Sequence, residues 1–306
     1  MLNILGKRYY FFALSCILII PGLILLALNG MPLSIDFKGG TLMEIQFKSG
    51  VVPTTAQVKS IYNEFGIQDA QIQTTGSDEL IIRSSELSQQ NQKDILAKLT
   101  EISASELLIL RSDTVGPSIG KGVTTRAAEA VAVASIAVVL YIAFAFRGVP
   151  HAFGYGICAI IAMIHDVFIV LAITGYGAVL FGWQVDSLYL TAVLTIIGFS
   201  VQDTIVVFDR IRENTSIYRK LDFEKLVNHS IVQTLQRSIN TQLMTVEFFL
   251  LALALFGGIT LREFCIILLI GMISGTYSSI FIAAPVFVVW DKQEWKTWFK
   301  RTPKEA

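Results

Sequence analysis

Six long apolar runs constrain this 306-residue chain more than any other feature of its sequence. A helix of about 20 apolar residues spans roughly 30 Å of hydrocarbon, at 1.5 Å per residue. The composition agrees, because 53% of the residues are hydrophobic and only 16% are charged. We predict membrane-spanning helices at residues 9–28, 127–146, 152–174, 188–208, 243–256 and 264–290. The chain is therefore expected to be a multi-pass α-helical membrane protein.

The basic residues predict how the chain is oriented. Lys7 and Arg8 precede the first run, a cluster that includes Arg210, Arg212 and Arg219 follows the fourth, and the tail after the sixth is also basic. The loop of residues 175–187 contains no Lys or Arg. The positive-inside rule then places both termini in the cytoplasm and the protein in the inner (plasma) membrane. The first run is long and lacks an A-x-A cleavage site, so we interpret it as an uncleaved helix rather than a secretory signal.

The domain organisation follows from these spans. Residues 1–28 form the N-terminus and the first span, and residues 29–126 form one extracytoplasmic α+β domain. Residues 127–292 carry the second to sixth spans with a cytoplasmic loop at 209–242, and residues 293–306 form a cytoplasmic tail.

The extracytoplasmic segment alternates strand and helix patterns. We predict strands at residues 42–47, 70–75, 79–84 and 106–113, and helices at residues 54–65 and 87–102. The resulting β-α-β-β-α-β order is that of a ferredoxin-like domain. A segment of this length buries one modest core, so a single lobe is expected.

The sequence argues against several classes of function. Cys16, Cys158 and Cys265 all lie in predicted spans, and no Cys/His spacing suggests a metal site. No basic patch with interleaved aromatics predicts nucleic-acid binding. Residues 115–124 resemble a phosphate loop, but Gly116 and Gly120 have three residues between them instead of four and Gly follows the Lys. We interpret this segment as a hinge before the second span, and we expect neither a cofactor nor an enzyme activity.

One carboxylate lies inside the fourth apolar run. Residues 195–214 read TIIGFSVQDTIVVFDRIREN, so Gln202 and Asp203 interrupt an apolar helix. An Asp near the centre of a bilayer helix costs about 2.5–3.5 kcal/mol on insertion scales, and such residues usually face a partner or mark an ion pathway. The alternative is a structural acid paired with a neighbouring helix. Burial disfavours the ionised carboxylate and a nearby Arg favours it, so a change in the distance of an Arg would change the affinity for a proton.

Weaker candidates lie elsewhere in the spans. His165 and Asp166 interrupt the third run, where they either extend a proton route or pair with each other or with Ser and Thr of a neighbouring helix. Glu247 is either a relay residue or an interfacial carboxylate. Residues 222–239 are amphipathic and either lie on the cytoplasmic membrane face or pack beneath the helices. Two sets of glycines complete the candidates: Gly39 and Gly40 are expected to form a turn with Asp36, and Gly198, Gly271 and Gly275 are expected to permit close helix contacts.

An ordered set of motifs along nearly the whole chain resembles SecF. These motifs are IDFKGGT (35–41), VGPSIGKGV (115–123), IHDV (164–167), the stretch around Asp203, SIVQTLQRSINTQ (230–242) and GTYSSIFIA (275–283). SecF is the smaller membrane subunit of the bacterial SecDF complex and a relative of the resistance–nodulation–division transporters. The resemblance implies six spans, a ferredoxin-like lobe, and proton-driven assistance to protein export.

The resemblance also implies roles and partners. Asp203 matches the family acid held to matter for proton passage, and Arg237 matches an Arg that would serve as its counter-charge. Gln202 replaces the usual Asn and Phe199 a common Tyr. The implied partners are a SecD-like six-helix subunit, the SecYEG channel, SecA, the translocating polypeptide and, as a further candidate, YajC. Two other readings remain open: an efflux-type half-transporter, and a non-conducting scaffold for the channel.

Overall fold

The structure is a computed structural model that describes residues 3–48, 52–75, 78–147, 152–242, 248–256 and 259–298. The chain divides into two compact units. The first, here called the helical unit, contains Met1–Met31, Val131–Trp183 and Leu188–Ala306. The second, here called the lobe, contains Pro32–Ala130 and Gln184–Ser187.

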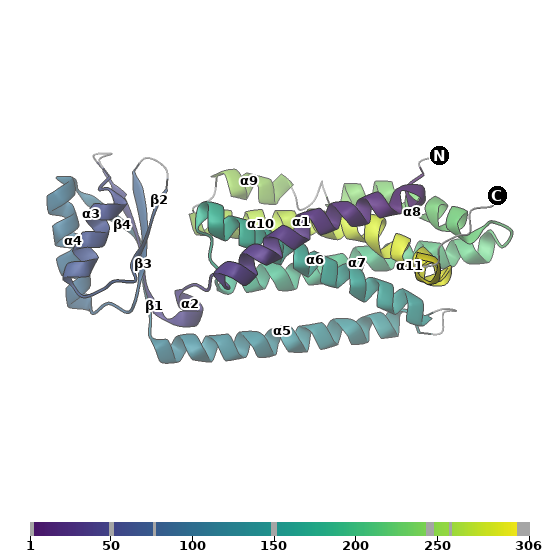
Figure 1. The fold of residues 1–306 in the computed structure, drawn as a ribbon, viewed down its shortest axis with the longest axis horizontal. Coiled ribbons are helices and arrows are strands. Elements are labelled where there is room, and N and C mark those ends of the chain that lie inside the picture. Colours follow the sequence, from purple (N-terminus) through teal and green to yellow (C-terminus); the bar gives the residue numbers. More distant parts are fainter. Residues whose placement is uncertain are drawn as a thin grey trace. The chain divides into compact units, whose positions relative to one another are not determined.

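Long apolar helices form the helical unit (Figure 1). The last long helix is continuous but changes pitch, because α10 passes through a π-helical turn, η3, into α11. The helices described outside the lobe are η1 (Leu5–Lys7), α1 (Arg8–Asn29), α6 (Ala152–Phe181), α7 (Ser187–Ile217), α8 (Phe223–Gln242), α9 (Phe248–Phe256), α10 (Ile259–Ser278), η3 (Ser279–Ala283), α11 (Ala284–Asp291) and α12 (Trp295–Trp298). The helix α5 (Pro117–Ala145) begins in the lobe and ends in the helical unit.

Five described helices are long and apolar enough to cross a membrane. They are Leu5–Asn29, Pro117–Ala145, Ala152–Phe181, Ser187–Ile217 and Leu261–Asp291. They correspond to five of the six predicted spans. The other prediction, residues 243–256, is described only over the nine residues of α9, since residues 243–247 lie outside the described part of the chain.

The predicted hinge after the lobe is wrong, because α5 already begins at Pro117 instead of at residue 127. Proline is favoured at the first helical position, where its missing N–H costs nothing. Gly120 then lies inside the helix, where a Cβ atom would meet the Gly39 nitrogen at 2.8 Å. Gly120, one of the glycines that suggested a hinge, therefore permits a close approach of two backbones.

The amphipathic segment predicted at residues 222–239 corresponds to α8, which packs against α10 and α11. Its apolar residues Leu226, Val227 and Ile231 are buried in the same core as Phe208 and Phe287. Of the two alternatives left by the sequence, packing against the other helices is the one observed.

Small residues bring α1 and α6 together. A Cβ atom added to Gly22 of α1 would lie 2.5 Å from the carbonyl oxygen of Ala172 and 2.6 Å from its Cα. Ser15 and Gly22 are the two buried residues of α1 and lie two turns apart on one face. This face fixes how α1 presents Ser15 to the interior of the helical unit.

The lobe is a four-stranded antiparallel sheet with two helices on one side (Figure 1). Its elements follow the order β1-α3-β2-β3-α4-β4, and the strand order is β2-β3-β1-β4. After the short helix α2 (Ile35–Lys38), they are β1 (Gly40–Phe47), α3 (Thr55–Glu64), β2 (Gln71–Thr75), β3 (Glu79–Ser84), α4 (Gln89–Ser103) and β4 (Leu107–Val115). Each lies within a few residues of its predicted position.

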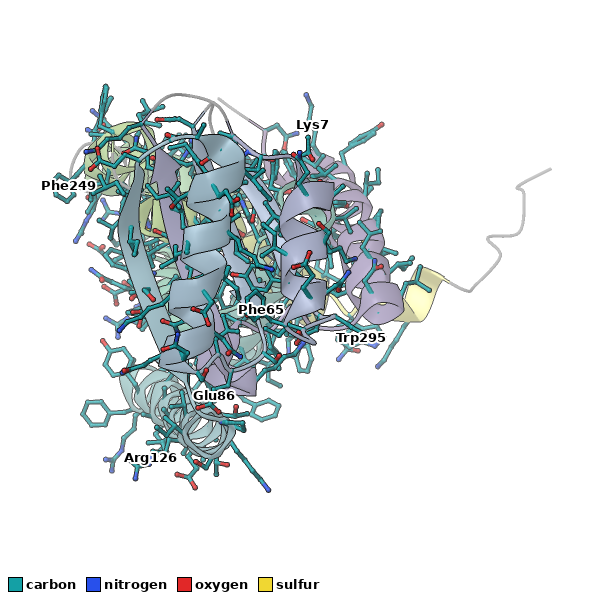
Figure 2. The ribbon with its side chains drawn as sticks, turned by 90° about the vertical axis from the view of Figure 1, so that its left-hand side faces the viewer. Lys7, Phe65, Glu86, Arg126, Phe249 and Trp295 are labelled. Atoms are coloured by element: carbon teal, nitrogen blue, oxygen red, sulfur yellow. The ribbon has the colours of Figure 1, made fainter. Side chains whose placement is uncertain are left out.

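Local chemistry explains these boundaries and the lobe core. Thr54 and Gln57 form a capping box at the start of α3, and Gly66 follows its end with a φ of 79°. Alternate residues of β1, including Ile45 and Phe47, face α3 and α4 in one buried cluster. Phe65, labelled in Figure 2, packs against this cluster at the end of α3.

Candidate functional site

Asp203 is buried inside the helical unit and is held by serines from two other helical segments. The Ser238 hydroxyl of α8 donates to Oδ1 at 2.8 Å, and the Ser279 hydroxyl of η3 donates to Oδ2 at 2.5 Å. Both carboxylate oxygens therefore have a donor, and the side chain links α7 to α8 and to the last long helix.

Asp166 on α6 is enclosed more completely, with 1% of its surface exposed. The hydroxyls of Ser200, Ser274 and Ser278 donate to its carboxylate at 2.5, 2.7 and 2.5 Å. The His165 Nδ1 lies 3.1 Å from Oδ1. Asp166 thus makes both contacts that the sequence left open, one with its neighbour His165 and the others with serines of α7 and α10.

His165 extends this network to α1. Its Nε2 lies 2.9 Å from the Ser15 hydroxyl, and the Tyr277 ring stacks on the imidazole with centroids 6.0 Å apart. The Tyr277 hydroxyl donates to the Phe11 carbonyl at 2.9 Å. A chain of polar contacts therefore runs through the interior from α1 to α6, and from there to α7 and α10.

Two other residues expected to belong to the proton pathway, Arg237 and Gln202, lie outside the contacts of Asp203. Arg237 is exposed and, among the described residues, forms no ion pair with Asp203, although it acts on the carboxylate electrostatically from longer range. Gln202 is exposed as well. Ser238, next to Arg237 in the sequence, makes the contact instead.

Four of these serines, Ser238, Ser274, Ser278 and Ser279, were not predicted as site residues. Ser278 and Ser279 stand within the GTYSSIFIA motif, where two consecutive hydroxyls interrupt an apolar run. Like His165 and Asp166, these hydroxyls are polar residues within an apolar run. A buried hydroxyl costs little free energy in a helix, however, because it can bond to the carbonyl three or four residues before it. A serine in a span therefore says little without its tertiary partners.

Asp36 and the paired glycines belong to the lobe. The Asp36 carboxylate accepts from the Ser187 N–H at 2.9 Å and from its hydroxyl at 2.7 Å. The expected turn is preceded by the one-turn helix α2, which ends at Gly39 with a φ of 80°, and Gly40 has a φ of 135°. A Cβ atom on Gly40 would collide with the Ser84 carbonyl oxygen, so only glycine fits where β1 begins beside β3.

The span glycines differ from one another. A Cβ atom on Gly275 would lie 3.4 Å from the Ser200 Cα, and one on Gly271 would collide with Ile196, so both face α7 closely. Gly198 has no such neighbour within 4 Å, so the predicted close contact is wrong there within the described chain. Glu247 lies outside the described residues.

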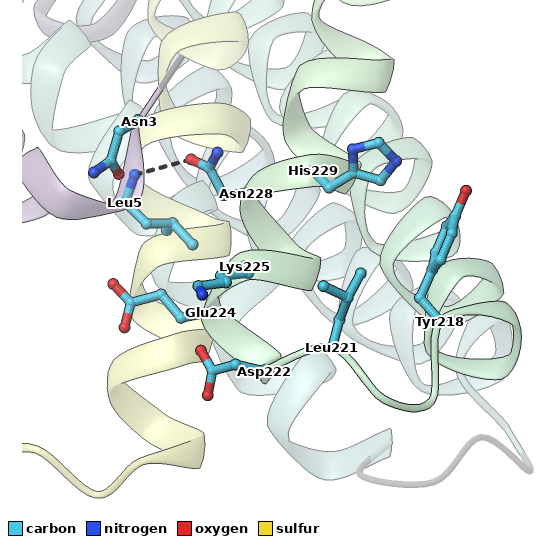
Figure 3. Close-up of a pocket in the computed structure, with 9 residues that line it drawn as sticks. All are labelled: Asn3, Leu5, Tyr218, Leu221, Asp222, Glu224, Lys225, Asn228 and His229. Carbon is cyan, nitrogen blue, oxygen red and sulfur yellow. Dashed lines mark hydrogen bonds between the residues drawn. The ribbon is translucent and has the colours of Figure 1, made fainter. Parts of the chain in front are cut away.

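A charged cluster joins the start of α1, the start of α8 and the end of α11. Arg8 pairs with Glu224 at 2.8 Å and with Glu294 at 2.6 Å, and Lys292 pairs with Glu224 at 2.5 Å. The hydrogen bond from Lys292, together with Arg8, holds the pKa of Glu224 below its usual value. Beside this cluster lies a pocket of about 630 Å³, where Asn228 accepts from the Leu5 N–H (Figure 3). The pocket contains none of the predicted site residues.

Comparisons with known proteins show the family of this chain and agree with its fold. The family described as "Protein export membrane protein SecD/SecF, C-terminal" matches residues 94–293, and the "SecD/SecF GG Motif" matches residues 24–51. The SecF subunit of the protein translocase from Anaerolinea thermophila is 62% identical over the whole chain and 99% of its own length. The SecF subunit from Thermobaculum terrenum is 46% identical, again over the whole of this chain and 99% of its own length.

Two solved structures resemble the chain. The crystal structure of SecDF from Thermus thermophilus, described as a translocon-associated membrane protein, matches with a TM-score of 0.83 and 33% identity over 95% of this chain. A SecDF structure in a super-membrane-facing form matches with a TM-score of 0.68 and 32% identity over 97% of it. This chain spans 39% of each of those longer SecDF chains. The chain is a membrane protein and belongs to the SecF family.

Proposed function

We propose that the protein is an accessory subunit of the bacterial Sec export machinery, in which proton flow through the membrane domain assists late-stage polypeptide translocation. The observation that carries this proposal is the pair of buried acids, Asp166 and Asp203, enclosed by hydroxyls from α7, α8, α10 and η3. Intramembrane acids with such partners are typical of proton relays. The names of the relatives favour protein export over the efflux alternative.

The proposed organisation has six spans, the sixth supplied by the segment around α9, with both termini in the cytoplasm. The domain boundaries are residues 28/29, 126/127 and 292/293, and the lobe is proposed to be a ferredoxin-like domain on the extracytoplasmic side. Such a chain is half of a pseudo-symmetric transporter, whose sites lie at the interface of its halves. The second half is proposed to be a SecD-like subunit, with SecYEG, SecA and YajC as further partners and no enzymatic activity in this chain.

The hydrogen bonds of Asp203 suggest how a proton could move helices. A hydrogen bond to a charged group contributes about 1.5–3 kcal/mol and one between neutral groups about 0.5–1.5 kcal/mol. Protonation would therefore weaken each serine contact by about 1 kcal/mol or slightly more, and two contacts by about 2–3 kcal/mol. One proton crossing 100 mV supplies about 2.3 kcal/mol. The two amounts match, so one proton is enough to loosen α8 and η3 from α7.

Asp203→Asn tests this proposal. The amide retains size and polarity but cannot cycle between charge states, so the variant is expected to assemble normally and to lose the stimulation of translocation by a proton gradient. The measurement is late-stage translocation into inverted vesicles with and without an imposed gradient, at equal abundance of the complex. Asp209→Asn is the matched control, since Asp209 is an exposed acid of the same helix that pairs with Arg212.

The scaffold reading makes the opposite prediction. Asparagine hydrogen-bonds much as a neutral acid does, so a purely structural Asp203 would make the substitution nearly silent. Stimulation by the gradient that survives in Asp203→Asn would therefore refute the proton-carrier role and leave structural pairing as the better account.

A further inference from the structure

Ser278 and Ser279 differ from the other serines around the two acids because each has two acceptors within reach. The Ser278 hydroxyl lies 2.5 Å from Asp166 Oδ2 and 3.1 Å from the Gly275 carbonyl oxygen. The Ser279 hydroxyl lies 2.5 Å from Asp203 Oδ2 and 3.0 Å from the Thr276 carbonyl oxygen. These consecutive residues thus touch different acids and, equally, the backbone of their own helix.

A hydroxyl has one proton and can donate to one acceptor fully at a time. When the carboxylate is ionised it accepts only, so the serine donates to it. When the carboxylic acid is protonated its own O–H can donate to the serine oxygen, and the serine proton is then free to bond to the carbonyl three residues before it. Ser200, Ser238 and Ser274 show no second acceptor in the described chain, so they lack this alternative.

The two serines stand where the last long helix changes its hydrogen-bond pattern. The α-helix α10 ends at Ser278, and the π-helical turn η3 begins at Ser279. Single π-helical turns inside α-helices frequently occur at functional sites. The carbonyls of Gly275 and Thr276 belong to the helical turn just before this change, so a new bond to either acts directly on the junction.

We propose that Ser278 and Ser279 sense the protonation of Asp166 and Asp203 and pass it to the π-helical turn by exchanging a carboxylate acceptor for a backbone one. The inference rests on the proposed function, in which the acids take up protons. It assigns the serines as positioning residues that couple the charge of two acids on α6 and α7 to the shape of the last span.

Other ionisable groups also face the acids. In the described chain they are His165 on α6 and Tyr277 on α10, on the side of Asp166, and Arg237 on α8, which acts on Asp203 from longer range. None of the three is altered by changing a serine. A change in the carboxyl titration of a serine variant therefore reports the lost hydroxyl rather than a changed charge nearby.

The test is a pH titration of the carboxyl infrared absorption in the purified complex. The bands are assigned by their loss in Asp166→Asn and Asp203→Asn. Ser279→Ala is expected to move the midpoint of the Asp203 band to higher pH, because the ionised form loses a donor. Ser278→Ala is expected to change the frequency of the Asp166 band, because that carboxyl group loses a hydrogen-bond donor. Ser135→Ala is the matched control, since the Ser135 hydroxyl bonds at 2.8 Å to the Val131 carbonyl of its own helix.

Translocation provides the second readout. The alanine variants are expected to retain gradient-independent translocation while the pH midpoint of gradient-driven stimulation moves upward, and Ser279→Thr, which retains a hydroxyl, is expected to restore it. If an alanine variant fails to assemble, cysteine at the same position has nearly the same size and a weaker donor and carries the same comparison.

The outcomes separate the two proposals. Serine variants that titrate and translocate like Ser135→Ala, while Asp203→Asn still abolishes stimulation, would overturn this inference and leave the proposed function standing. Stimulation that survives in Asp203→Asn would overturn the proposed function itself.

Discussion

Replacing Gly22 with alanine is expected to force α1 away from α6. The added Cβ atom would lie 2.5 Å from the Ala172 carbonyl oxygen, whereas an ordinary contact begins at 3.4 Å, so the helices must separate by roughly 1 Å. The colliding atoms are the backbone O and Cα of Ala172 and its Cβ, so no rotamer change can relieve them. Overpacking of this kind costs about 1–3 kcal/mol. The separation would also weaken the contact between Ser15 and His165, because Ser15 lies on the same buried face of α1.

The measurement is the free energy of unfolding of the full chain in detergent, compared with that of Gly156→Ala. A Cβ atom on Gly156 would lie 3.8 Å from Ile142, an ordinary contact on α6. Both variants gain the same helix propensity, up to about 1 kcal/mol, so their difference isolates the collision. Gly22→Ala is expected to be less stable than Gly156→Ala by about 1–3 kcal/mol. Equal stabilities within about 0.5 kcal/mol would show that α1 and α6 are not in close contact.

Two further predictions concern the charged cluster and the orientation. Because the pKa of Glu224 is lowered in the folded protein, the stabilising effect of Glu224 is present above the usual Glu value of about 4.3 and is lost as the pH falls through the lowered pKa. The unfolding free energies of wild type and Glu224→Gln should therefore converge on acidification; a gap that is constant or widens would contradict this. Lys93→Cys, at an exposed position on α4, should react with an impermeant maleimide added outside the cell. Labelling of this cysteine only after the reagent is given access to the cytoplasm would show that the lobe lies on the cytoplasmic side instead.

Local patterns predicted the lobe well because its strands and helices are set by short-range chemistry. Thr54 with Gln57, and Gly66 after the helix, are signals of a helix start and a helix end that do not depend on the rest of the fold. The same reasoning failed at Pro117, where a helix begins and Gly120, a residue type that normally marks a loop, lies inside it with the backbone of Gly39 close by. Contacts between segments distant in sequence decide such positions, and a local pattern does not contain them.

The sequence alone determined that Asp166 and Asp203 lie in apolar helices, since an acid within a long hydrophobic run is visible without any structure. Only the tertiary structure decided what surrounds them. Arg237, the charged partner of Asp203 that the family resemblance implied, stays exposed, and Ser238 of α8 and Ser279 of η3 take its place. The physical reason is that a buried carboxylate must be hydrogen-bonded, but any hydroxyl that packing brings close can satisfy it. Periodicity identifies the acids, whereas helix packing selects their donors.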